Sequence, residues 1–186
     1  MKTYGRLISV VLFLVIILVV AQVSGLREHF TLAFVQQKLA DNRVVGLLVF
    51  VLLFTLGNLI QIPGWVFLAA AVLALGKTEG FAATYVAACV SCAFTFLAVR
   101  YVGQDALRQI RNRLAVRILA HLDARPIRSI VLLRTFFQTL PVVNYALALS
   151  GVGFRKYMVG TMLGLPLPIA LYCVFFDYLG AMVRAG

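Results

Sequence analysis

Long apolar runs separated by short polar segments make up most of the chain. The runs cover residues 7–23, 44–76, 81–99, 129–154 and 157–181. A helix needs about 20 residues to cross a ~30 Å hydrocarbon core, with about 17 as the lower limit. Runs 7–23, 81–99 and 157–181 are therefore predicted as full transmembrane helices. A cleaved signal peptide is the alternative for 7–23, because small residues follow it.

The runs 44–76 and 129–154 each have a proline and amide side chains near the centre. Proline removes a backbone donor, and non-helical backbone at membrane depth is tolerated only inside protein or beside a wet cavity. Each run is therefore predicted as a re-entrant hairpin with its tip inside the membrane. A single proline-kinked helix is the alternative for 44–76. The polar and tip residues are Asn58, Gln61, Pro63 and Gly64 in the first hairpin, and Arg134, Gln138, Pro141 and Asn144 in the second.

The segment 100–128 concentrates positive charge, with seven arginines against two aspartates. Apolar residues from Leu107 to Leu122 recur on one helical face, as in an amphipathic helix at the membrane surface. A solvated cytoplasmic loop is the favoured alternative, because the basic charge alone is sufficient to explain it. Basic loops face the cytoplasm, so this segment and the N-terminus are expected inside. The hairpins then enter from opposite faces. The surface cations expected to contact lipid include Arg100, Arg108, Arg111, Arg113 and Arg117.

These elements predict an all-α polytopic membrane protein. We expect an inverted repeat with two facing re-entrant hairpins and about three full transmembrane helices. Residues 1–43 form an N-terminal helix and an interfacial connector, and residues 44–181 form the membrane domain. In the last helix, Gly160 and Gly164 form a small-residue contact motif and Pro166 is expected to cause a kink.

Composition excludes a soluble monomer. Apolar residues make up 63% of the chain and charged residues 12%, against roughly 25% charged in an average soluble domain. The net charge of +11 indicates contact with anionic lipid headgroups rather than nucleic acid. Six carboxylates and two histidines leave little material for acid–base or metal catalysis, so we expect no enzyme activity, cofactor or metal. Cys89 and Cys92 have C-x-x-C spacing within an apolar run, which favours a buried helix contact over a metal or redox site.

The second half of the chain resembles the DedA, or SNARE-associated Golgi protein (VTT domain), family. The resemblance is carried by the stretch from Arg134 to Tyr145 and by a glycine, aromatic and Gly-Thr-x-x-Gly pattern that ends at Pro166. Pro63-Gly64 with Ala69–Ala71, and Arg100–Gly103, resemble the N-terminal half of the family. The resemblance implies two facing hairpins and the movement of lipids between leaflets.

One departure from the family pattern affects the expected mechanism. Many bacterial members carry an acidic residue just before the first proline motif, whereas this chain has no carboxylate between Asp41 and Glu79. A proton-coupled mechanism that uses this acid is therefore disfavoured, and passive scrambling or a different form of coupling is favoured.

The function expected is translocation of phospholipid or polyprenyl-phosphate headgroups, by a scramblase or flippase-like protein of the bacterial inner membrane. Facing amides would supply hydrogen bonds along the route, and Arg134 would pair with phosphate. The alternatives are an ion-coupled small-molecule transporter and a non-catalytic membrane scaffold. Asp177 is the carboxylate that coupling would require, but its place near the end of the last helix favours a solvated interface. The expected partners are membrane lipids, and self-association into a homo-oligomer is left open.

Overall fold

A computed structural model describes residues 15–16, 43–60, 62–103, 113–138 and 140–185. The described residues form helices and no strands, as the sequence predicted. The helix and connector predicted over residues 7–43 lie almost wholly outside the described residues. The main helices are α4 (Arg43–Leu59), α5 (Gly64–Leu75), α6 (Lys77–Gly103), α7 (Arg113–Ala124), α8 (Pro126–Phe137), α9 (Pro141–Leu149), α10 (Phe154–Gly164) and α11 (Pro166–Ala185).

Two helical stretches are long and apolar enough to cross a membrane, namely Lys77–Gly103 and Phe154–Met182. They correspond to the helices predicted over 81–99 and 157–181, and both are longer than predicted. The short polar segment between the runs 44–76 and 81–99 was expected to separate two elements, but residues 77–80 form the first turn of α6. Gly76 alone, at φ 80°, makes the reversal from α5 into α6. Glycine adopts this left-handed conformation without steric cost.

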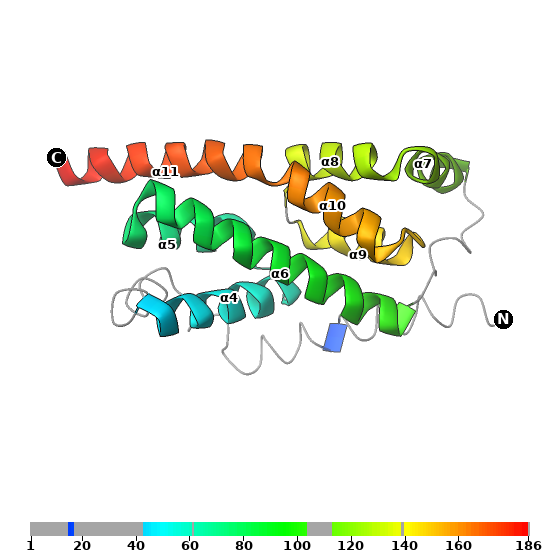
Figure 1. Ribbon diagram of the computed structural model, residues 1–186, viewed down its shortest axis with the longest axis horizontal. Coiled ribbons are helices and arrows are strands. Elements are labelled where there is room, and N and C mark those ends of the chain that lie inside the picture. The colour runs from blue at the N-terminus through cyan, green and yellow to red at the C-terminus, as the bar shows by residue number, and fades with distance from the viewer. Residues whose placement is uncertain (1–14, 17–42, 61, 104–112, 139, 186) are drawn as a thin grey trace.

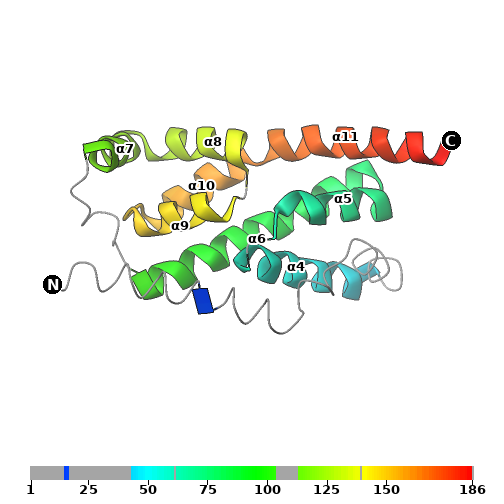
Figure 2. The same cartoon turned by 180° about the vertical axis from the view of Figure 1, so that it is seen from behind.

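The helix pairs α4–α5 and α8–α9 open toward opposite ends of the molecule (Figure 1). In each pair the chain runs from one end to the middle of the long axis, breaks, and returns toward the same end. Helix α6 runs obliquely between the two pairs, and α10 and α11 follow one another from one end to the other. The view from behind shows the same order (Figure 2). The two segments predicted as interrupted are therefore both helix–break–helix units.

Prolines mark where the two helices of the second helix–break–helix unit begin. Pro126 occupies an N-terminal position of α8 and Pro141 one of α9, where the missing N–H is not needed. Helix α8 therefore begins before residue 129, and the basic segment predicted to end at 128 extends into its first turn. The long final helix is interrupted at Leu165, before Pro166, where the sequence predicted a kink.

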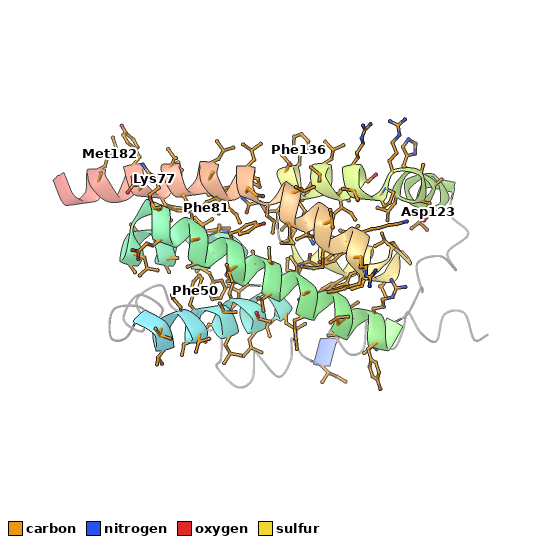
Figure 3. The ribbon with its side chains drawn as sticks, in the orientation of Figure 1. Phe50, Lys77, Phe81, Asp123, Phe136 and Met182 are labelled. Atoms are coloured by element: carbon orange, nitrogen blue, oxygen red, sulfur yellow. The ribbon has the colours of Figure 1, made fainter. Side chains whose placement is uncertain are left out.

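On α6, large apolar side chains are exposed and small or polar side chains are buried, which is the reverse of the pattern in a soluble protein. Its exposed face carries Val86, Val90, Phe94 and Leu97, which are 44% to 53% exposed. Its buried face carries small and polar side chains, among them Thr84, Ser91, Cys92 and Thr95. Exposed apolar side chains also cover α11 and α8, where Met182 and Phe136 project from the outer edge (Figure 3). An apolar exterior of this extent indicates a membrane environment.

Glycines bring α10 against α8. A Cβ placed on Gly160 would lie 2.7 Å from the Cβ of Ile130, and one on Gly164 would lie 2.7 Å from the Cβ of Arg134. Real Cβ atoms do not approach so closely, so only glycine permits this packing. The small-residue motif predicted at Gly160 and Gly164 is therefore a helix contact, and it fixes the position of Arg134.

Helix α7 lies at the end of the molecule opposite the C-terminus. Its coil is seen nearly end-on in Figures 1 and 2, so its axis lies across the long axis of the other helices. Leu122 is buried, while His121 and Asp123 are exposed. Of the surface cations predicted here, Arg108 and Arg111 lie outside the described residues. Arg113 and Arg117 belong to α7, and their side chains are not described.

Candidate functional site

Arg134, on α8, is fully buried although it is the one charged residue of its apolar run. Its guanidinium donates three hydrogen bonds. Nε donates to Thr161 Oγ1 over 3.3 Å, one terminal nitrogen donates to the carbonyl of Gln138 over 2.8 Å, and the other donates to the hydroxyl of Tyr157 over 2.8 Å. All three acceptors are neutral. Within the described residues, no carboxylate forms an ion pair with this cation.

Tyr157, on α10, connects the guanidinium to α6 and α9. Its hydroxyl oxygen lies 3.1 Å from the carbonyl of Cys92 and 3.3 Å from Oδ1 of Asn144, and both are acceptors for its single proton. Cys92 Sγ also lies 3.7 Å from the same Asn144 oxygen. The ring of Tyr157 packs on Phe96, with 4.3 Å between centroids. We call Arg134, Gln138, Asn144, Tyr157, Thr161 and Cys92 the Arg134 cluster.

The break between α8 and α9 orients one acceptor of this cluster. Gln138 has φ 47° and ψ −125°, a conformation that glycine adopts more readily than glutamine. Its N–H donates to the carbonyl of Arg134 and thereby ends α8, while its own carbonyl accepts from the guanidinium. The strained backbone thus turns a carbonyl toward the cation.

The two helix–break–helix units are in direct contact. The hydroxyl of Tyr145, on α9, donates to the carbonyl of Leu59 at the end of α4 over 3.1 Å. Asn58, in the last turn of α4, is buried, and its Nδ2 donates to Ser91 Oγ on α6 over 2.8 Å. Side chains of α6 and α9 therefore form hydrogen bonds with the last turn of α4.

A cavity of about 10 Å³ lies between the units and is lined by Gly64, Thr84 and Gln138 together with apolar side chains. The volume is comparable to the minimum that one water molecule needs. Thr84 Oγ1 and Gln138 Nε2 are buried without a hydrogen-bond partner within the described residues. Gly64 and Gln138, predicted to lie near the two hairpin tips, are therefore neighbours of one cavity.

The remaining predicted residues occupy several positions. Pro141 is the buried first residue of α9, Pro63 is the exposed residue before α5, and Gln61 lies outside the described residues. Arg100 belongs to the last turn of α6 rather than to a loop, and it donates to the carbonyl of Val152 over 2.7 Å. It therefore connects α6 to the turn after α9, instead of standing free at the surface.

Two expectations about titratable side chains are clarified by the structure. The side chain of Asp177 is 42% exposed and lies 3.6 Å from Lys77 Nζ, which places it in an ion pair at the surface. Cys92 is buried at the contact of α6 with α9, and Cys89 is half-buried. No group of three histidine, cysteine or acidic side chains among the described residues is arranged to hold a metal ion.

Sequence reasoning did not select Tyr157, Thr161, Cys92 or Ser91 as site residues. Tyr157 and Thr161 were identified only as parts of a pattern, although their spacing of four places both on one face of α10. Thr84, Ser91 and Thr95 recur at intervals of seven and four along α6, which also indicates one helical face. A search for polar side chains in register along an otherwise apolar helix would have found them.

The VTT domain family matches residues 62–178, which is more than half of the chain and includes the whole Arg134 cluster. No curated protein and no solved structure matches the chain. The matched region also contains both membrane-capable helices and the second helix–break–helix unit. The chain belongs to the VTT domain family, the domain of the DedA and SNARE-associated Golgi proteins.

Proposed function

We propose that the chain is a lipid translocase of the scramblase or flippase-like type, which moves phosphate-bearing headgroups between the leaflets of a membrane. The substrates are phospholipids or polyprenyl phosphates, and the protein breaks no covalent bond. The observation that carries this proposal is Arg134, a fully buried cation whose acceptors within the described residues are all neutral.

A buried charge is costly unless an opposite charge compensates it. A guanidinium has five N–H groups, and three of those on Arg134 donate to described acceptors. The amide nitrogens of Asn144 and Gln138 are also buried, and neither has an acceptor among the described residues. Unpaired donors around a cation favour an anion with several oxygens. A phosphate group has this chemistry, and arginine recognises it with two parallel hydrogen bonds.

The arrangement of the helices supports a route for such a headgroup. We place α4–α5 and α8–α9 as re-entrant hairpins that enter the membrane from opposite faces and form an inverted repeat. The C-terminus and Lys77 then face outward, and α7 and the start of α8 face the cytoplasm. The Arg134 cluster and the cavity beside Gly64 lie where the hairpins meet. Arg134 is enclosed in this structure, so a headgroup enters when the hairpins separate.

Ion-coupled transport of small molecules is the second candidate, and the described residues favour it less. The charged side chain buried in the described residues is a cation, and Asp177, whose side chain is 42% exposed, forms an ion pair with Lys77. A carboxylate that binds and releases a proton at the centre is therefore missing from the described part of the chain. We propose passive scrambling, in the inner membrane of a bacterium.

Reconstituted liposomes test the proposal. Fluorescent phospholipids are incorporated in both leaflets, and a membrane-impermeant reductant bleaches only the outer ones. Wild-type protein should expose all fluorophores to bleaching, while Arg134→Met should leave about half protected. Arg134→Lys should restore activity only in part, because an ammonium keeps the attraction and loses the bidentate geometry. Arg155→Ala is the matched control, since Arg155 is an exposed cation in the first turn of α10.

The melting temperature of Arg134→Met distinguishes a functional role of Arg134 from a structural one. Methionine has a similar volume, and removal of the buried charge offsets the loss of the donors to Gln138, Tyr157 and Thr161. Arg134→Met should therefore remain folded, with a melting temperature within a few degrees of the wild type. If Arg134→Met is folded and scrambles at the wild-type rate, Arg134 is not the phosphate partner. If the wild-type protein itself leaves half of the fluorophores protected, the proposed activity is wrong.

A further inference from the structure

A second basic feature lies at the start of α8, away from the buried cluster. A surface hollow of about 380 Å³ is lined by five residues of two elements, and three of them are cations. Arg125 and Arg128 come from the start of α8, and Lys156 comes from the first turn of α10. All three are exposed, and none of the lining residues is acidic.

These cations stand where the helix dipoles disfavour them. The N-terminus of a helix carries a partial positive charge and free N–H groups, so acidic residues are favoured there and basic residues are not. Neither α8 nor α10 has an acidic residue in its first turn, and neither has a side-chain cap. The three cations of the hollow therefore come from the first turns of two helices that both lack a side-chain cap. A bound anion would offset this concentration of positive charge.

The glycine contacts keep the two helix starts together. Gly160 packs against Ile130, and its added Cβ would also lie 3.2 Å from the carbonyl of Ile127, which lines the hollow. This packing holds the first turns of α10 close to the backbone of α8. The cations are preorganised by backbone packing rather than gathered by flexible loops.

We propose that this hollow binds the headgroup of an anionic phospholipid at the cytoplasmic surface of the membrane. Helix α7, which ends beside Arg125, lies across the long axis of the molecule, as a helix in the plane of a membrane surface would (Figure 1). In this placement the hollow lies at the depth of lipid phosphates. Ile127, which is 37% exposed, offers an apolar contact for the adjoining acyl chain. The site is distinct from the Arg134 cluster and does not require lipid movement.

Native mass spectrometry of the full chain in an uncharged detergent tests the site. The protein is titrated with dioctanoyl phosphatidylglycerol, with dioctanoyl phosphatidylcholine and with inorganic phosphate. Phosphatidylglycerol should bind most tightly. Each of Arg125→Gln, Arg128→Gln and Lys156→Gln should weaken its binding by about fivefold, as expected for one cation near a membrane surface. Arg155→Gln is the control, because Arg155 precedes Lys156 and does not line the hollow.

Each alternative outcome overturns the assignment. Equal binding of the two lipids would mean that the hollow does not recognise the anionic headgroup. Phosphate that binds as tightly as phosphatidylglycerol would indicate a site for a free anion instead of a lipid. An equal loss of binding in Arg155→Gln would show that net charge, and not this hollow, attracts the lipid. The hollow variants should scramble at the wild-type rate in liposomes of neutral lipid, so failure of this site and failure of the proposed transport are distinguishable.

Discussion

The hydroxyl of Tyr145 donates to the carbonyl of Leu59 across the meeting point of the two helix–break–helix units, over 3.1 Å. Leu59 is the last residue of α4, so its carbonyl belongs to the group that a helix end leaves without an intrahelical donor. Tyr145 is 7% exposed and packs within the same core as Tyr157. One side chain of the second unit thus satisfies the backbone of the first.

Tyr145→Phe should lower the stability of the protein by about 1 kcal/mol, because the carbonyl of Leu59 loses a partner in a buried setting. The measurement is the midpoint of thermal unfolding in detergent micelles, followed by circular dichroism. Tyr101→Phe is the control, since Tyr101 is 89% exposed and its hydroxyl is free to meet solvent. Equal midpoints for the two variants would mean that the bond between the units contributes nothing.

Gly164→Ala should destabilise the protein by about 1–3 kcal/mol, in the range of overpacked cores. The added Cβ would lie 2.7 Å from the Cβ of Arg134 and 2.9 Å from the carbonyl of Val131, and a backbone carbonyl cannot move away cheaply. Gly153→Ala should have little effect, because nothing lies within 4 Å of a Cβ there. Comparison of the two unfolding midpoints measures the difference, and a Gly164→Ala variant as stable as Gly153→Ala would contradict the close packing.

The lengths of the apolar runs and the positions of the prolines predicted the helical class and the two interrupted runs. They misplaced the boundaries at residues 77–81 and 126–129. A single glycine with positive φ replaces a whole loop at Gly76, and run length contains no information about that. Likewise, the polar residues that follow Pro126 are compatible with either a loop or a helix start.

The candidate site was predicted only in part, for a related reason. Arg134, Gln138 and Asn144 were detectable because polar residues are rare in an apolar run. Their partners Tyr157 and Thr161 belong to a different run, and only the packing of α10 on α8 brings them together. The spacing of residues in the sequence does not predict these hydrogen bonds, because close contacts at glycines determine how α10 packs on α8.

Labelling of single cysteines should place the two ends of the molecule on opposite sides of the membrane. Lys77 and Asp123, which lie at opposite ends in Figure 3, mark these ends. The background carries Cys89→Ala, Cys92→Ser and Cys173→Ala, in which serine keeps a donor toward Asn144. In intact cells, an impermeant maleimide should label Thr78→Cys and leave Arg128→Cys unmodified until the membrane is opened. Labelling of both positions in sealed cells would refute the opposed hairpins.

Gln138→Gly should separate the structural role of this residue from its functional role. At φ 47° and ψ −125°, glutamine holds a strained backbone that glycine adopts freely, and relief of such strain is worth on the order of 1 kcal/mol. The substitution also removes a buried amide nitrogen that has no acceptor among the described residues. The backbone carbonyl that accepts from Arg134 remains. The unfolding midpoint should therefore stay the same or rise.

Lipid movement should nevertheless fall in Gln138→Gly, because the route beside Gly64 loses a side chain that can hydrogen-bond a passing headgroup. Gln138→Asn is the companion variant: it keeps an amide and the strain, so it should retain more activity than glycine with no gain in stability. Both quantities are measured on the same preparations, by the bleaching assay and by thermal unfolding. A glycine variant that is less stable than the wild type would show that the glutamine side chain holds the break together, and unchanged scrambling would remove Gln138 from the route.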